Sequence, residues 1–153
     1  MKKVCHITSV HKWNDVRIFL KECSSLAKAG FDTTLIATNC PSDKVNGVNV
    51  IGVNTNTSSE KNRLLRIITT TNKVYLKALE VDADIYHIHD PELLPYALKL
   101  KRKGKKVIYD VHEDVPQQIK DKYWIPSLLR NFISATFMLY ETHAAKNLSF
   151  IIT

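Results

Sequence analysis

Three titratable side chains end one predicted strand in the stretch DIYHIHDPELLP, residues 84–95. Side chains alternate between the two faces of a strand, so His87 and His89 share one face. Pro91 suits the first turn of a helix, where a missing N–H costs little. His87, His89 and Asp90 are therefore expected at the carboxyl tip of a strand. Imidazole and carboxylate groups placed there can hydrogen-bond a polar ligand or bind a divalent metal.

Two other loops that contain histidine and acidic residues also follow predicted strands. The first is SVHKWNDVR, residues 9–17, and the second is VHEDVP, residues 111–116. In a doubly wound sheet, ligands bind beyond the carboxyl ends of the strands, near the point where the strand order switches. The sequence therefore predicts that these two loops and HDPE, residues 89–92, form one functional rim.

The elements that must position this rim alternate along the chain. Strands are predicted at residues 3–8, 31–38, 48–53, 84–89, 105–111 and 148–153, and helices at 15–30, 63–81, 91–103 and 128–147. In the first helix, helical spacing predicts an apolar face made of Val16, Phe19, Leu20, Cys23, Leu26 and Ala27. The alternation predicts an α/β fold, a doubly wound, mainly parallel Rossmann-like sheet with residues 3–8 as a central strand.

Composition limits the function classes. The 153 residues suffice for one domain, and no stretch approaches the roughly 20 apolar residues that cross a bilayer. Three cysteines without metal-ligand spacing indicate a reducing, cytoplasmic setting. The net charge of +7 suits an anionic partner, but the basic runs lack interleaved aromatic residues, so nucleic acid is not expected. The four glycines form no phosphate-binding fingerprint.

Several ordered motifs resemble one family. HITSVHKWNDVRIFLKECSSLAKAGFDTTLIA, DIYHIHDPELLPYALKLKRKGKKVIYDVHEDVP and the final FIIT are similar to the N-terminal half of a retaining glycosyltransferase of the GT-B fold, family 4. The resemblance implies that residues 1–153 form the acceptor-side domain. It also implies a donor-binding C-terminal domain that this chain lacks, and little or no activity for this chain alone. The implied partners are a nucleotide-sugar donor, a glycan or lipid-linked acceptor and that second domain, with no metal or other cofactor.

The same resemblance assigns site residues. HIHDPELLP matches the family pattern of a histidine before an acidic residue and a proline, so His89 is implied as the active-site histidine, close to the transferred sugar and the donor diphosphate. Many relatives carry two glycines in the first loop, whereas this chain has Ser9 and Val10. This departure makes His11, Asp15 and Arg17 candidates for contacts with the acceptor. Contacts with the acceptor or sugar are also expected from Asp90, Glu92, His112 and Glu113, which lie on the other two loops of the rim.

Two other function classes stay open. A metal-dependent hydrolase could use His87-x-His89 with Asp90 and the HED run at 112–114. A non-catalytic, anion-binding Rossmann-like module would explain the basic charge.

The apolar helix at 128–147 is expected to cover the sheet. Its alternatives are contact with the second domain, or peripheral contact with the inner face of the membrane, which suits a lipid-linked acceptor.

Overall fold

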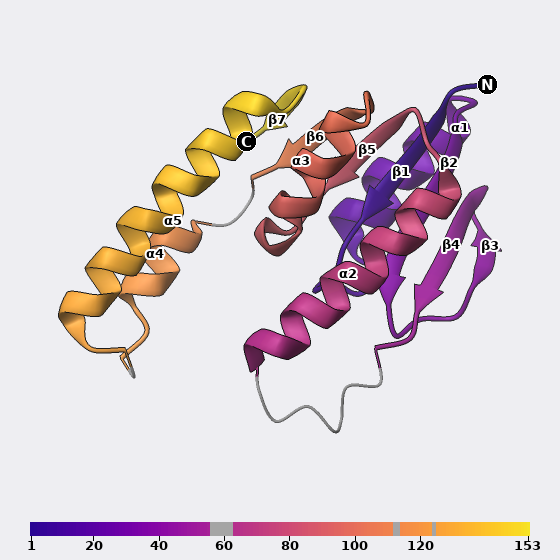
Figure 1. The fold of residues 1–153 in the computed structure, drawn as a ribbon. Coiled ribbons are helices and arrows are strands. Elements are labelled where there is room, and N and C mark those ends of the chain that lie inside the picture. Colours follow the sequence, from indigo (N-terminus) through magenta and orange to yellow (C-terminus); the bar gives the residue numbers. More distant parts are fainter. Residues whose placement is uncertain (56–62, 112–113, 124) are drawn as a thin grey trace.

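The computed structural model describes residues 1–55, 63–111, 114–123 and 125–153. A single sheet of seven strands runs through this part of the chain in the order β3-β4-β2-β1-β5-β6-β7 (Figure 1). The strands are β1 (Lys3–Ile7), β2 (Asp32–Thr38), β3 (Asp43–Val45), β4 (Val48–Val53), β5 (Ile85–Ile88), β6 (Lys106–Asp110) and β7 (Phe150–Ile152). All neighbouring pairs are parallel except β3 with β4. The predicted α/β class and the central place of β1 are confirmed.

The strand order reverses at β1. From there the chain proceeds to β2 and β4 on one side, and it returns to place β5 on the other side. The gap between the ends of β1 and β5 is therefore the switch point, where ligands bind in folds of this class.

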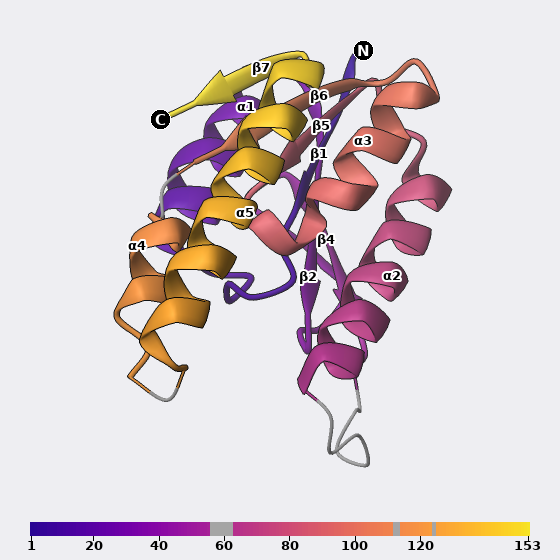
Figure 2. The ribbon, with the colours of Figure 1, turned by 60° about the vertical axis from the view of Figure 1, so that its left-hand side comes forward.

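Helices cover both faces of the sheet. They are η1 (Val16–Cys23), continued by α1 (Ser24–Lys28), then α2 (Arg63–Val81), η2 (Pro91–Leu93) with α3 (Leu94–Arg102), α4 (Val115–Lys120) and α5 (Ser127–Asn147). Figure 2 shows α2 and α3 on one face and α1 on the other. One apolar core lies under α2 and α3, and a smaller one, with Phe19, Leu35 and Val50, lies under η1.

η1 is wound as a π-helix, which the sequence did not indicate. Its wider turn changes which side chains face the sheet. Ile18, Phe19 and Cys23 are buried, whereas Val16 and Leu20, which helical spacing placed on the apolar face, are 59% and 50% exposed. Short π-helical segments occur often at functional sites.

The segment at 39–47, between two predicted strands, contains a further strand that the sequence did not indicate. β3 pairs with β4 as an antiparallel hairpin, and Asn46 and Gly47 form its turn with φ of 52° and 81°. Asn-Gly is the pair that a two-residue hairpin turn with positive φ at both positions requires.

α5 is also placed differently from the expectation that it covers the sheet. Only Ser134 and Ala144 of this helix are buried, and α5 packs on α3 and α4 at the end of the sheet near β7 (Figure 1). Leu128, Phe132 and Leu139 are exposed by 85%, 70% and 69%. No described helix is both long and apolar enough to cross a membrane.

Candidate functional site

Three histidines gather on the face of the sheet that η1 covers. His6 of β1 is in register with His87 of β5, and His89 follows two residues later on the same face. All three are buried, with 0%, 6% and 1% of their surface exposed. His6 Nδ1 lies 2.9 Å from His89 Nε2, and the rings of His87 and His89 stack with centroids 4.5 Å apart.

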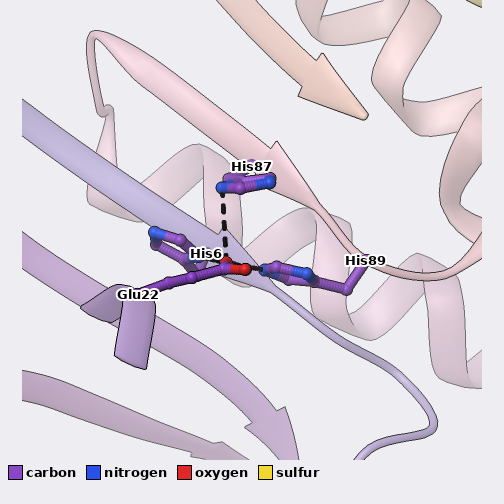
Figure 3. Close-up of side chains that lie close together, drawn as sticks. All are labelled: His6, Glu22, His87 and His89. Carbon is purple, nitrogen blue, oxygen red and sulfur yellow. Dashed lines mark hydrogen bonds and ion pairs between the residues drawn. The ribbon is translucent and has the colours of Figure 1, made fainter. Parts of the chain in front are cut away.

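Glu22 of η1 completes this group, as Figure 3 shows. Its Oε2 lies 3.7 Å from His6 Nδ1, 3.8 Å from His87 Nδ1 and 3.8 Å from His89 Nε2. We call His6, Glu22, His87 and His89 the four-residue cluster. Glu22 is its most accessible member, with 25% of its side chain exposed.

A carboxylate and a guanidinium support the cluster from β6 and η1. Asp110, at the end of β6, places Oδ2 3.3 Å from His89 Nδ1. Arg17 donates to both oxygens of the same carboxylate, from Nε at 3.1 Å and from Nη2 at 2.5 Å. Because a carboxylate accepts hydrogen bonds, this contact assigns the proton of His89 to Nδ1 and leaves Nε2 as the acceptor that faces the cluster.

Burial controls the protonation of the cluster. It lowers the pKa of His6 well below the ordinary value, helped by the neighbouring His87 and His89. Burial, and then His89, lowers the pKa of His87 to about 3. Burial also raises the pKa of Glu22 above its usual range, partly offset by His89 and Arg17. At neutral pH the His6 and His87 imidazoles are therefore uncharged and keep a lone pair on one nitrogen.

Asp90 organises the loop that follows β1. Its carboxylate accepts hydrogen bonds from Thr8 Oγ1 at 3.0 Å, from the Ser9 backbone N–H, and from Val10 N at 3.3 Å. His11 Nε2 lies 3.3 Å from the other carboxylate oxygen. Asp90 is only 2% exposed, so its main contacts are with this loop.

A polar pocket of about 470 Å³ lies beside this loop, at the carboxyl ends of β1, β2 and β4. Hydroxyl, amide, guanidinium and carboxylate groups line it together with two apolar side chains. The lining residues are Ser9, Val10, Thr38, Asn39, Thr55, Arg66, Ile67, Thr70, Thr71 and Glu92.

Comparison with known proteins identifies the class. A family model described as Glycosyltransferase Family 4 matches residues 16–153. The chain belongs to glycosyltransferase family 4.

A solved structure with a similar fold is consistent with this family. Sucrose-phosphate synthase from Thermosynechococcus elongatus is similar in fold, with a TM-score of 0.67 and 13% sequence identity. The match covers 99% of this chain and 42% of that chain, so the domain spans less than half of that protein. At this identity the likeness shows the fold, which is that of a GT-B glycosyltransferase. No curated protein is significantly similar in sequence.

The predicted site residues lie in different parts of the family 4 domain. His89 joins the four-residue cluster, Arg17 pairs with Asp110, and Glu92 lines the polar pocket. His11 and Asp90 hold the loop after β1. Asp15 caps η1, because its Oδ1 accepts from the backbone N–H groups of Arg17 at 2.8 Å and Ile18 at 3.0 Å. His112 and Glu113 lie outside the described residues.

Sequence reasoning missed three members of the site. His6 is central to the family 4 domain's cluster, yet in the sequence it is one histidine of an ordinary strand. The sequence did contain a signal for His6. It lies on a strand that was predicted to be central, and a central strand can pair with the strand that carries His87 and His89. Glu22 and Asp110 gave no comparable signal, because the rotation of η1 and the register of β6 determine where they point.

Proposed function

We propose that this domain is the acceptor-side half of a retaining hexosyltransferase. The enzyme moves a sugar from a nucleotide-sugar donor to a glycan or lipid-linked acceptor. A second domain of the same protein supplies the donor site, in keeping with the 42% of the sucrose-phosphate synthase chain that this domain covers. Alone, the chain is expected to transfer sugar at a negligible rate. No metal or other cofactor has a step in the proposed transfer.

The polar pocket beyond β1, β2 and β4 is the observation that carries this proposal. Sugar hydroxyls both donate and accept hydrogen bonds, and the pocket offers both kinds of partner, from Thr38, Asn39, Arg66 and Glu92 among others. Its volume of about 470 Å³ lies within the roughly 300–1,000 Å³ that is typical of small-molecule sites. Its position beside the β1 loop is that expected for a ligand in a doubly wound fold.

His89 is the residue that we assign to the transferred sugar. Its contact with Asp110 leaves Nε2 as an acceptor, which faces His6 Nδ1 at 2.9 Å, so a sugar hydroxyl would replace His6 as the hydrogen-bond donor to this atom. The ring is buried, so a ligand would first meet the exposed members of its surroundings, Glu22 and Arg17. The Arg17 side chain is 45% exposed, and the planar donors of its guanidinium suit a phosphate group.

Substitution in the full-length protein tests these assignments. We expect His89→Ala to lower turnover about a hundredfold, because loss of a preorganised hydrogen bond in the transition state costs roughly 3 kcal/mol. His143→Ala, on the exposed surface of α5, is the control and should leave turnover unchanged. Arg66→Ala, in the pocket wall, should raise the KM for the acceptor more than it lowers kcat. Equal, mild effects of His89→Ala and His143→Ala at matched folded fraction would refute the assignment of His89.

We further propose that the enzyme works in the cytoplasm at the inner face of the membrane. The exposed apolar side chains of α5 and the net charge of +7 support this location. Sedimentation with anionic vesicles tests this location. The double variant Leu128→Glu/Phe132→Glu should bind the vesicles less than the wild type does, and equal binding by the variant and the wild type would contradict the proposal.

A further inference from the structure

We propose that His6, Glu22, His87 and His89 form a binding site for a divalent transition metal ion of the zinc type. One ligand atom from each residue lies within 4.8 Å of every other. Three imidazoles and one carboxylate are donors that Zn²⁺, Co²⁺ and Ni²⁺ accept, whereas Mg²⁺ and Ca²⁺ prefer oxygen ligands. The site differs from the HED-containing site considered from the sequence, because two of its ligands come from β1 and η1.

Several distances in the cluster are close to those around a tetrahedral ion. Bonds of about 2.0–2.1 Å place neighbouring tetrahedral ligand atoms about 3.3 Å apart. In the cluster, His6 Nδ1 and His89 Nε2 are 2.9 Å apart, and Glu22 Oε2 lies 3.7–3.8 Å from the three histidine nitrogens. The remaining pairs lie within 4.8 Å, so an ion at the centre would draw the ligand atoms inward.

An unsatisfied oxygen in the cluster also favours a cation. Glu22 Oε2 is one of the buried side-chain atoms in the described part of the chain that have no hydrogen-bond partner. A buried polar atom without a partner costs roughly 1–3 kcal/mol. Glu22 Oε2 points at three histidine nitrogens and bonds with none of them, which is the arrangement that a shared metal ion would satisfy.

The surroundings of His89 resemble those of a metal ligand. Metal-binding histidines usually donate their second ring N–H to a carboxylate, which fixes the ring and strengthens the ligand. Asp110 Oδ2 lies 3.3 Å from Nδ1 of His89 and can accept its N–H, and Arg17 holds Asp110 by two hydrogen bonds. The lowered pKa values of His6 and His87 also suit coordination, because they keep both imidazoles unprotonated and a metal binds the unprotonated imidazole.

Four protein ligands would fill a tetrahedral coordination sphere. Structural zinc sites are closed in this way, whereas catalytic sites keep an open position for water or substrate. The inferred ion would therefore tie β1, β5 and η1 together, and it argues against the hydrolase alternative. Because the ion would occupy Nε2 of His89, it and the sugar contact exclude each other. This last consequence rests on the proposed function, and bound metal is then expected to inhibit transfer.

Metal titration of the full-length protein, purified without a polyhistidine tag and stripped with chelator, tests the site. Addition of Co²⁺ should give tetrahedral d–d absorption that saturates at one equivalent. Zn²⁺ at 100-fold above its Kd should raise the Tm by about 5–10 °C, whereas Mg²⁺ should not. Absence of both stoichiometric Co²⁺ binding and a Zn²⁺-dependent rise in Tm would overturn the proposal.

Matched variants locate the ion. His87→Gln should weaken Co²⁺ binding at least about 100-fold, and Asp110→Asn about 10–100-fold. His143→Gln controls for adventitious binding by a surface histidine and should bind as the wild type does. Equal binding by His87→Gln and His143→Gln would overturn the site. If His87→Gln does not fold, Glu22→Gln serves in its place, because that side chain is partly exposed. Tight binding without inhibition would keep the metal site and refute the sugar contact of His89.

Discussion

The Arg17–Asp110 pair makes a quantitative prediction about the support of His89. Asp110 is fully buried at its side chain, and Arg17, 45% exposed, contacts both of its oxygens. Arg17→Ala would remove this bidentate partner from a buried carboxylate. Loss of one partner of a buried pair typically costs about 3–5 kcal/mol. Because His89 still faces Asp110, and because Arg17 is partly solvated, we expect a loss of about 2–3 kcal/mol in the free energy of unfolding.

Urea denaturation monitored by circular dichroism measures this loss. In a domain of this size, a change of 2–3 kcal/mol corresponds to a fall in Tm of about 4–12 °C. Arg102→Ala, in the exposed last turn of α3, is the control and should change the free energy by less than about 0.5 kcal/mol.

A double variant separates charge burial from lost packing. Most of the cost of Arg17→Ala comes from the buried charge of Asp110, which loses its guanidinium partner. Arg17→Ala/Asp110→Asn should therefore be more stable than the sum of the single variants predicts, by about 1–2 kcal/mol. An Arg17→Ala protein as stable as the Arg102→Ala protein would refute the claim that this pair holds Asp110 in place.

Two further predictions concern the sheet and its histidines. Gly52→Ala should lower the free energy of unfolding by about 2 kcal/mol or more, because the added Cβ would lie 1.7 Å from the Cys40 carbonyl oxygen; an unchanged urea midpoint would contradict this. With a chelator present, the free energy of unfolding should fall as the pH drops below about 6.5. His6 and His87 are buried and stay unprotonated in the folded state at this pH, whereas in the unfolded chain they bind protons. Two such groups give a slope of up to about 2.7 kcal/mol per pH unit, reduced by Glu22, whose raised pKa acts oppositely. A flat stability profile between pH 7 and 5 would show that these histidines are not held neutral.

Local sequence patterns predicted most of the sheet and part of the site. Period-two alternation correctly placed His87 and His89 on one face, since that depends only on the geometry of a strand. The alternation of strands and helices predicted that the sheet is mainly parallel. The β3–β4 hairpin was missed although its Asn46-Gly47 turn was visible, because β3 has only three residues and little apolar pattern.

The other members of the site depend on tertiary packing. His6 meets His87 only through the register of β1 and β5. Glu22 points at the histidines because η1 is wound as a π-helix, and a 3.6-residue period cannot predict that rotation. The exposure of α5 is also a tertiary property, because a helix that is apolar on most sides packs equally well on a sheet or on a partner.

The central claim is that this domain takes part in sugar transfer with retention of configuration. The most direct measurement supplies the full-length protein with a panel of nucleotide sugars and a polyprenyl-phosphate-linked glycan acceptor, and follows the product by NMR. We expect one donor class to be used, a product with the same anomeric configuration as the donor, and about a hundredfold slower transfer by His89→Ala. A product of inverted configuration would contradict the retaining mechanism, and the absence of transfer from every donor by folded protein would contradict the proposed function.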